Sequence, residues 1–279
     1  MNNLIRPLIL LTRPFMSAIP AVGTIIAVQI SARGQAWSPL ALTLAVTNAC
    51  LAAGSMVIND WFDAESDRIN KPDRPIPSGQ ISRTHALWFA IALFAASFVG
   101  SLLVSPLIGL YAGLVIVLST AYSMILKRYL FVNNALVAAI TCYPLFSAGL
   151  LTQNLDRLVI PIAATFIFIF GREILKDAED IEGDRQYGVV SVANKWGMSA
   201  AVYSGVILLN LALVVAAGQY LRRINDAWFL IVLGPALLAD LVVAYRLVRD
   251  MSKRNLLRSL DASAVALLWG SLAFVVGLR

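Results

Sequence analysis

Two segments of the chain carry the same acidic pattern, with aspartates at relative positions 0, 3 and 7 followed by an arginine. The first copy lies in NDWFDAESDR (59–68) and the second in KDAEDIEGDR (176–185). At about 100° per helical residue, these offsets fall within an arc of roughly 60°, so each copy places three carboxylates on one stripe. Their mutual repulsion is unfavourable unless a cation lies among them. The aspartates are Asp60, Asp63 and Asp67 in the first copy, and Asp177, Asp180 and Asp184 in the second.

The donor atoms in these stripes indicate which cation they would hold. Most of the 16 acidic residues lie in or beside the two segments, and the single histidine, His85, does not. Oxygen donors without paired His or Cys suit a hard cation, Mg²⁺ or Mn²⁺, and argue against zinc or iron. Mg²⁺ binds one or two carboxylates together with water and phosphate oxygens. Nearby basic residues could hold those phosphate oxygens, and they are Lys71, Arg74, Lys127, Arg128, Arg172, Lys176 and Arg185.

The elements that must position these residues are predicted to be membrane-spanning helices. The 279 residues are 59% hydrophobic and only 14% charged, with a mean hydropathy of +0.77. A helix of about 20 apolar residues crosses a hydrocarbon core of roughly 30 Å. The sequence therefore predicts an all-α membrane protein, a single domain over 1–279, with nine transmembrane helices. They are expected near 11–32, 39–58, 85–104, 107–126, 133–153, 157–175, 198–218, 227–245 and 261–278.

The basic residues predict the orientation of these helices. Most of the 22 lysines and arginines fall at the N-terminus and in the loops after the second, fourth, sixth and eighth helices. Positively charged loops stay in the cytoplasm, so both acidic stripes are expected on the cytoplasmic side of the cell membrane. The bases are scattered without an aromatic platform, which argues against nucleic-acid binding.

A ligand with a diphosphate head and an apolar tail fits a metal site at the edge of a membrane. A polyprenyl diphosphate has this form, and Mg²⁺ would neutralise its departing diphosphate. Candidates for stabilising the allylic cation are Trp61, Phe62, Tyr122, Tyr143, Phe166 and Phe170. Two alternatives stay open: a cation-coupled lipid or metabolite carrier using the same aspartates, and terpene cyclisation without an acceptor.

The paired motifs resemble those of the UbiA superfamily of intramembrane prenyltransferases. NDWFDAESD (59–67) looks like the first motif of that family, N-D-x-x-D-x-x-x-D, and KDAEDIEGD (176–184) looks like its second. The resemblance spans the whole chain. It implies transfer of a prenyl group from a diphosphate donor, with Mg²⁺ as cofactor, in a bundle of nine helices around a polar cavity open to the cytoplasmic side.

The loops carry a finer resemblance. DRINKPDRPIPSG (67–79) and GREILKDAEDIEGD (171–184) are similar to the digeranylgeranylglyceryl phosphate synthases, which alkylate a glycerol hydroxyl in ether-lipid synthesis. The chain departs from them at VVSVANKWG (189–197), where those enzymes tend to have a lysine-threonine-leucine-proline stretch. An aromatic or chlorophyll-type acceptor therefore remains the alternative to a lipid acceptor.

The expected roles follow from the motifs and their surroundings. All six aspartates are predicted metal ligands, and Asp67 or Asp184 is also the predicted base that deprotonates the acceptor. Glu173 extends the second stripe by one turn. Donor chain length and oligomeric state do not follow from the sequence. The predicted diphosphate contacts are Asn59, Arg68, Lys71, Arg74, Lys127 and Arg172.

Overall fold

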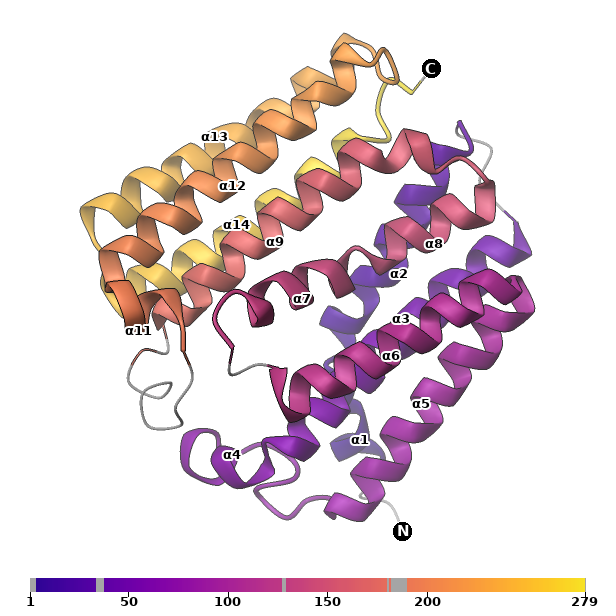
Figure 1. Ribbon diagram of the computed structural model, residues 1–279, viewed down its shortest axis with the longest axis vertical. Helices are drawn as coiled ribbons and strands as arrows, with labels where there is room; N and C mark the ends of the chain where they lie inside the picture. The colour runs from indigo at the N-terminus through magenta and orange to yellow at the C-terminus, as the bar shows by residue number, and fades with distance from the viewer. Residues whose placement is uncertain (1–3, 34–37, 127–128, 180, 182–189, 279) are drawn as a thin grey trace. The chain divides into compact units, whose positions relative to one another are not determined.

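The computed structural model of the protein describes residues 4–33, 38–126, 129–179, 181 and 190–278, apart from the side chain of Asn70. Within these residues the regular structure is helical (Figure 1), and a single β-bridge pairs Asn225 with Leu278 outside any strand. The prediction of an all-α fold is confirmed.

Nine stretches of the described residues are long and apolar enough to cross a membrane, which agrees with the predicted number. Each overlaps one of the predicted ranges, so the chain is an integral, multi-pass membrane protein. The stretches are α2 (Pro14–Ser31), α3 (Pro39–Phe62), α5 (Arg83–Val104), α6 (Pro106–Met124), α7 with α8 (Val132–Thr152), η2 with α9 (Leu155–Glu179), α12 (Met198–Leu221), α13 (Ala227–Arg249) and α14 (Lys253–Ala273).

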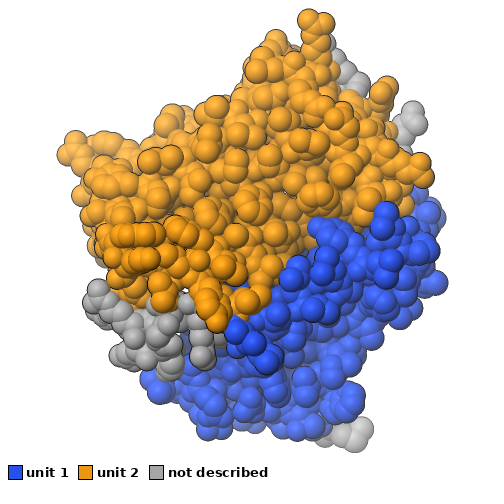
Figure 2. All heavy atoms as spheres, viewed as in Figure 1, with its two compact units in different colours: residues 1–25, 36–125 blue, residues 26–35, 126–279 orange. Residues whose placement is uncertain are grey.

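The chain divides into two compact units (Figure 2). Unit 1 comprises Met1–Ile25 and Ala36–Ile125, and unit 2 comprises Ile26–Gln35 and Leu126–Arg279. In unit 1, α3 packs against α5 and α6, and the short helices α1 (Ile5–Thr12) and α4 (Ala64–Asn70) adjoin it. In unit 2, α9 packs against α12 and α7, and α13 packs against α14. Each acidic motif belongs to a different unit, and a single domain over 1–279 stays a prediction.

The fifth span is interrupted in its middle, whereas a continuous helix was predicted over 133–153. Helix α7 (Val132–Thr141) ends at Cys142, and α8 (Tyr143–Thr152) begins directly after it. The cause is Pro144, which lacks an N–H group and crowds the carbonyl of the preceding turn. The Cys142 N–H group closes the end of α7 by bonding to the carbonyl oxygens of Ala138 and Ala139, both at 3.2 Å.

The last span begins eight residues before the predicted 261, because its first two turns are amphipathic and were read as loop. The Ser252 hydroxyl caps α14 by accepting a hydrogen bond from the Asn255 N–H group at 3.4 Å, as serine commonly does at an N-cap. Leu256 and Leu260 are buried in the first turns. At the other end, the Asn225 amide donates to the Phe274 and Val276 carbonyl oxygens, which ends the helix at Ala273.

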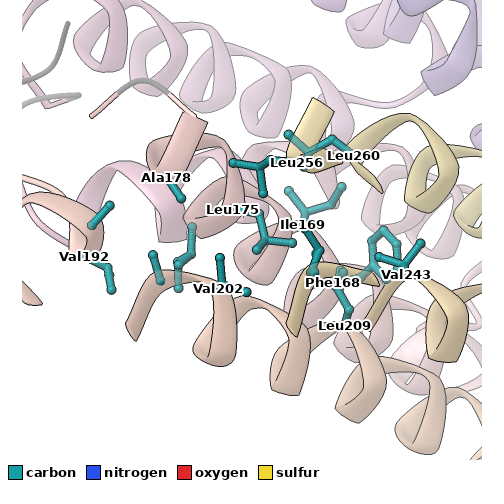
Figure 3. Packing of buried hydrophobic residues seen from close by; sticks show 14 of the residues in the cluster. Phe168, Ile169, Leu175, Ala178, Val192, Val202, Leu209, Val243, Leu256 and Leu260 are labelled. Atoms are coloured by element: carbon teal, nitrogen blue, oxygen red, sulfur yellow. The ribbon is translucent and has the colours of Figure 1, made fainter. Parts of the chain in front are cut away.

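Close packing of α9 against α12 positions the second acidic motif. The two helices meet at Gly171 and Gly205, and a Cβ atom added at Gly171 would lie 2.7 Å from Leu208 Cβ and 3.0 Å from the Gly205 carbonyl oxygen. Small residues allow such close approach between membrane helices. The contact continues into an apolar core (Figure 3) in which Phe168, Ile169 and Leu175 from α9 pack with side chains from α12, α13 and α14: Val202, Leu209, Val243, Leu256 and Leu260.

A methyl group at this crossing is expected to destabilise unit 2. Gly171→Ala overpacks the interface, and we expect a loss of about 1–3 kcal/mol, measured as a lower thermal unfolding temperature in detergent. Gly234→Ala in α13 is the matched control, because its Cβ would meet nothing within 4 Å. Equal unfolding temperatures for the two variants would contradict this account of the α9–α12 contact.

Candidate functional site

The first acidic motif lies at the junction between α3 and α4. Asp60 is in the last turn of α3, Asp63 separates the two helices, and Asp67 is in α4. Helical hydrogen bonds continue through the junction, because the Asp63 N–H group bonds to the Asn59 carbonyl oxygen at 2.9 Å and the Asp67 N–H group to the Asp63 carbonyl oxygen at 2.8 Å. The stripe predicted for one helix is thus formed by two helices in succession.

Two of these carboxylates are buried and held by arginines. Asp60 is 3% exposed and Asp67 is 5% exposed. The Arg74 Nη1 atom lies 3.0 Å from Asp60 Oδ1 and 2.6 Å from Asp67 Oδ2. The Arg13 Nη2 atom lies 2.7 Å from the same Asp60 oxygen. A buried carboxylate needs such partners, because an isolated charge away from water is very costly. In the described structure, Arg13 and Arg74 therefore offset the charge of these carboxylates.

The proline-rich segment after α4 folds back and carries Arg74 to the aspartates. The Ser78 N–H group bonds to the Arg74 carbonyl oxygen at 3.0 Å, and the Ile81 N–H group to the Pro75 carbonyl oxygen at 3.2 Å. Ile76 and Ile81 are buried in a cluster with residues of α1, α3 and α5. Burial of these apolar side chains holds the segment against the helix that bears Asp60.

The described part of the second motif lies in the last two turns of α9 (Val159–Glu179). Glu173 is 9% exposed, and the Lys176 Nζ atom contacts both of its carboxylate oxygens, at 2.9 and 3.0 Å. Asp177 Oδ2 accepts a hydrogen bond from the Asn134 side-chain amide at 2.9 Å. Asn134 lies in α7 and is 1% exposed, and its own N–H group bonds to Asn133 Oδ1 at 2.7 Å. A buried amide from a neighbouring helix therefore fixes Asp177.

Arg172 is a candidate for contact with an anion. It lies in α9 one residue before Glu173, and its Nε atom is buried without a hydrogen-bond partner in the described part of the chain. A buried donor that lacks a partner carries a cost of about 1–3 kcal/mol, which a bound phosphate oxygen would remove. The role of Arg172 as a diphosphate contact stays a prediction.

The remaining predicted residues fall into two groups. Asn59 is partly buried in α3, and Lys71 is exposed at the end of α4. Arg68 is exposed, with its Nη1 atom 3.0 Å from Glu65 Oε2, so its described ion pair is not with an aspartate of the motif. Lys127, Asp180 and Asp184 lie outside the described residues.

Reasoning from the sequence missed Arg13 and the pair Asn133–Asn134. Arg13 was counted only among the bases that set the orientation. The signal in the sequence is Pro14, the proline that follows Arg13. In the structure, Arg13 adopts φ 45°, a left-handed conformation that L-residues rarely take. The two asparagines open an otherwise apolar span, where buried amides require partners.

The residues of the first motif fit a hard divalent cation in donor chemistry. In the described part of the chain, no three side chains of the ligating types converge closely enough to hold a metal ion. Asp60 and Asp67 nevertheless meet at one nitrogen of Arg74, at distances of 2.6 and 3.0 Å. One oxygen of each aspartate thus already contacts the same positively charged group. Carboxylate oxygen is also the donor that Mg²⁺ prefers.

Buried acidic side chains and adjoining arginines at the ends of membrane-spanning helices mark a functional site for charged ligands. The model of the UbiA prenyltransferase family matches residues 20–275. The chain belongs to this family, so it is a prenyltransferase, as predicted.

Relatives of similar length extend this finding. The chain is 34% identical over 275 residues to the digeranylgeranylglyceryl phosphate synthase of Natronomonas pharaonis, covering 97% of this chain and 99% of the relative. It is 36% identical over 254 residues to the enzyme of the same name from Methanoregula boonei, covering 88% and 87%.

Solved structures agree in fold. A structure reported for digeranylgeranylglyceryl phosphate synthase in membranes is 28% identical, with a TM-score of 0.80 over 98% of both chains. A UbiA homologue from Archaeoglobus fulgidus bound to DMAPP and Mg²⁺ is 18% identical, with a TM-score of 0.73 over 96% of this chain and 98% of that one. The second likeness shows the fold alone.

Replacing Arg74 is expected to destabilise the first motif. Arg74→Gln leaves Asp67 buried without its described partner and Asp60 with Arg13 alone, and removing one partner of a buried ion pair costs about 3 kcal/mol or more. Chemical denaturation in detergent measures this loss.

Arg68→Gln is the control, because its pair with Glu65 is exposed on both sides and such pairs contribute about 0–1 kcal/mol. The double variant Arg74→Gln/Asp67→Asn should recover part of the loss. Equal stability of Arg74→Gln and Arg68→Gln would refute the assigned role of Arg74.

Proposed function

We propose that the protein transfers a polyprenyl group, of the geranylgeranyl class, from its diphosphate to the hydroxyl group of a glycerol-phosphate ether lipid. The reaction depends on Mg²⁺ and takes place at the cytoplasmic face of the cell membrane. The observation that carries the proposal is that Asp60 and Asp67 are both buried and both contact the Arg74 guanidinium. The names of the full-length relatives support the donor and the acceptor.

In this proposal both acidic motifs bind Mg²⁺ together with the donor diphosphate. Bound Mg²⁺ supplies charge neutralisation for the departing diphosphate, which makes the allylic C–O bond easier to break. The residues assigned to it are Asp60, Asp63, Asp67, Asp177, Asp180 and Asp184.

The cationic side chains orient the diphosphate. Arg172 has a buried donor without a described partner, and Arg74 already lies between two motif carboxylates. When a diphosphate arrives, these guanidinium groups can donate paired hydrogen bonds to its oxygens. Asn59, Lys71 and Lys127 complete the proposed set of contacts.

The apolar part of the donor is expected to lie along α9. Phe166 and Phe170 stack with ring centroids 6.2 Å apart and an interplanar angle of 6°. Their spacing places them on the same face of the helix as Glu173 and Asp177. An aromatic wall that continues from the carboxylates can shelter the prenyl chain and stabilise positive charge developing at its first carbon.

The acceptor hydroxyl must lose its proton when the new ether bond forms. Asp67 and Asp184 remain the proposed bases. The Arg74 Nη1 atom lies 2.6 Å from Asp67 Oδ2, so this arginine can orient the Asp67 carboxylate.

Removing one carboxylate from either motif is expected to abolish Mg²⁺-dependent turnover. Asp63→Ala and Asp177→Ala should each lower the rate of product formation by about 100-fold or more. The assay follows radiolabelled geranylgeranyl diphosphate with Mg²⁺. Asp73→Ala is the control, because this exposed carboxylate lies in the same loop region but outside the motif. Full activity of either motif variant in purified form would defeat the assignment.

A panel of acceptors in the same assay tests the substrate and the reaction class. A glycerol-phosphate ether lipid should give diphosphate release with a new lipid product, and chelation by EDTA should stop it until Mg²⁺ is restored. Product formed only with an aromatic or chlorophyll-type acceptor would refute the ether-lipid assignment. Uptake into liposomes without covalent product would instead indicate a carrier, and product without an acceptor would indicate cyclisation.

Asn134 is expected to act through Asp177. Asn134→Ala removes the 2.9 Å hydrogen bond, and loss of such an outer-shell partner commonly costs about 10–100-fold in metal affinity or activity. The expected result is a rise in the Mg²⁺ concentration that gives half-maximal rate. Cys142→Ala, at the end of α7, serves as the control for a general effect on this helix. An unchanged Mg²⁺ requirement in Asn134→Ala would count against the role.

A further inference from the structure

A pocket lies in unit 1, beside the first acidic motif but lined by other side chains. It has a volume of about 340 Å³ and is formed by α4, the segment after it and the first residue of α5. This volume falls within the range of small-molecule pockets, about 300–1,000 Å³. Its lining is formed by Ala64, Arg68, Ile76, Pro77, Gly79, Ile81, Ser82 and Arg83.

The charge of this pocket is positive. Arg68 and Arg83 both reach it, and they share one carboxylate, Glu65, at 3.0 and 3.4 Å. Two guanidinium groups and one carboxylate leave a net positive charge. All three side chains are substantially exposed, so these ion pairs are weak and a stronger anion can replace the carboxylate.

Two further features favour an anion in the pocket. The wall at Ser82 and Arg83 is the N-terminus of the 22-residue helix α5, whose positive dipole end attracts negative charge. Arg83 is also held in place, because its guanidinium lies 4.8 Å from the centroid of the Trp61 ring and donates to the Trp61 carbonyl oxygen at 3.3 Å. A guanidinium that is already oriented loses less entropy when it binds phosphate.

The pocket lies where a membrane-spanning stretch begins. Arg83 is the first residue of the candidate span Arg83–Val104, and α4 with its following segment precedes that span. Ile76, Pro77 and Ile81 provide an apolar wall next to the two arginines. Two guanidinium groups that can bind phosphate lie beside an apolar wall at the edge of the bilayer. This arrangement matches a lipid headgroup with the start of its acyl chains.

We propose that this pocket binds the phosphate group of an anionic membrane lipid, held by Arg68 and Arg83 at the N-terminus of α5. The site lies apart from Asp60 and Asp67, because the described ion pairs of Arg68 and Arg83 are with Glu65. Arg68, predicted from the sequence as a diphosphate contact, is here assigned to the lipid phosphate instead. The bound lipid fixes α4 and the segment that carries Arg74 against the membrane surface.

The test is native mass spectrometry of the full-length protein purified in detergent and titrated with phosphatidylglycerol or with zwitterionic phosphatidylcholine. The wild-type protein should retain phosphatidylglycerol preferentially. Arg68→Gln/Arg83→Gln should weaken that retention by roughly tenfold or more. Lys253→Gln/Arg254→Gln is the matched control, because it removes two exposed cations from the start of another long, serine-capped helix, and it should retain the lipid as the wild type does.

Glu65→Gln gives a prediction of opposite sign. This variant removes the carboxylate that competes for both arginines, so it should raise the affinity for phosphatidylglycerol, whereas loss of a merely structural contact would not. The thermal unfolding temperature of each variant without added lipid shows that it is folded.

Three outcomes would overturn the proposal. One is equal retention of phosphatidylglycerol and phosphatidylcholine by the wild type. Another is an equal loss in the control pair and in Arg68→Gln/Arg83→Gln. The third is binding of soluble glycerol phosphate with the same affinity as the lipid, because the site would then recognise a free phosphate ester and not a membrane lipid.

Discussion

Burial of carboxylates at the end of a membrane helix is the constraint on which the first acidic motif depends. Asp60 and Asp67 are almost fully enclosed, and Arg13 and Arg74 offset their charge. Arg74 can do so only because the segment after α4 folds back and buries Ile76 and Ile81. Ion pairing, loop conformation and apolar packing are therefore one cooperative arrangement. In the proposed function, a metal ion would bind these carboxylates, and the arginines would then be available to pair with the diphosphate.

The carboxylates of the second acidic motif are held in a different way. Asp177 is fixed by a neutral amide, Asn134, and Glu173 by Lys176. The helix that carries them is held by close contact between Gly171 and Gly205, which lets α9 and α12 approach closely. Phe166 and Phe170 occupy the same face of α9 deeper in the span. One helix thus presents carboxylates at its end and aromatic rings deeper in the span, which suits the proposed donor with its charged head and apolar tail.

Much of the fold could be predicted, because apolar runs of spanning length and basic loops follow directly from the solvent properties of the bilayer. The junction at Asp63 could not be predicted, because it depends on packing. The interruption at Cys142 follows from Pro144, which is visible in the sequence as a candidate for a kink, and it modifies a helix whose existence was correctly predicted. In the candidate site, the spacing of the aspartates indicated the two motifs, and their role as metal ligands stays a prediction. Asn134 and Arg13 were missed, because a partner from another element leaves no periodic pattern in the sequence.

The central claim of the proposal is that metal binding requires the carboxylates of both acidic motifs. Electron paramagnetic resonance of Mn²⁺, added with an unreactive thio-analogue of geranylgeranyl diphosphate, tests it directly, because the spectrum separates bound from free ion. The account predicts tight, analogue-dependent Mn²⁺ binding in the wild type, lost alike in Asp63→Ala and Asp177→Ala. Undiminished binding in either variant, with both proteins folded, would contradict it.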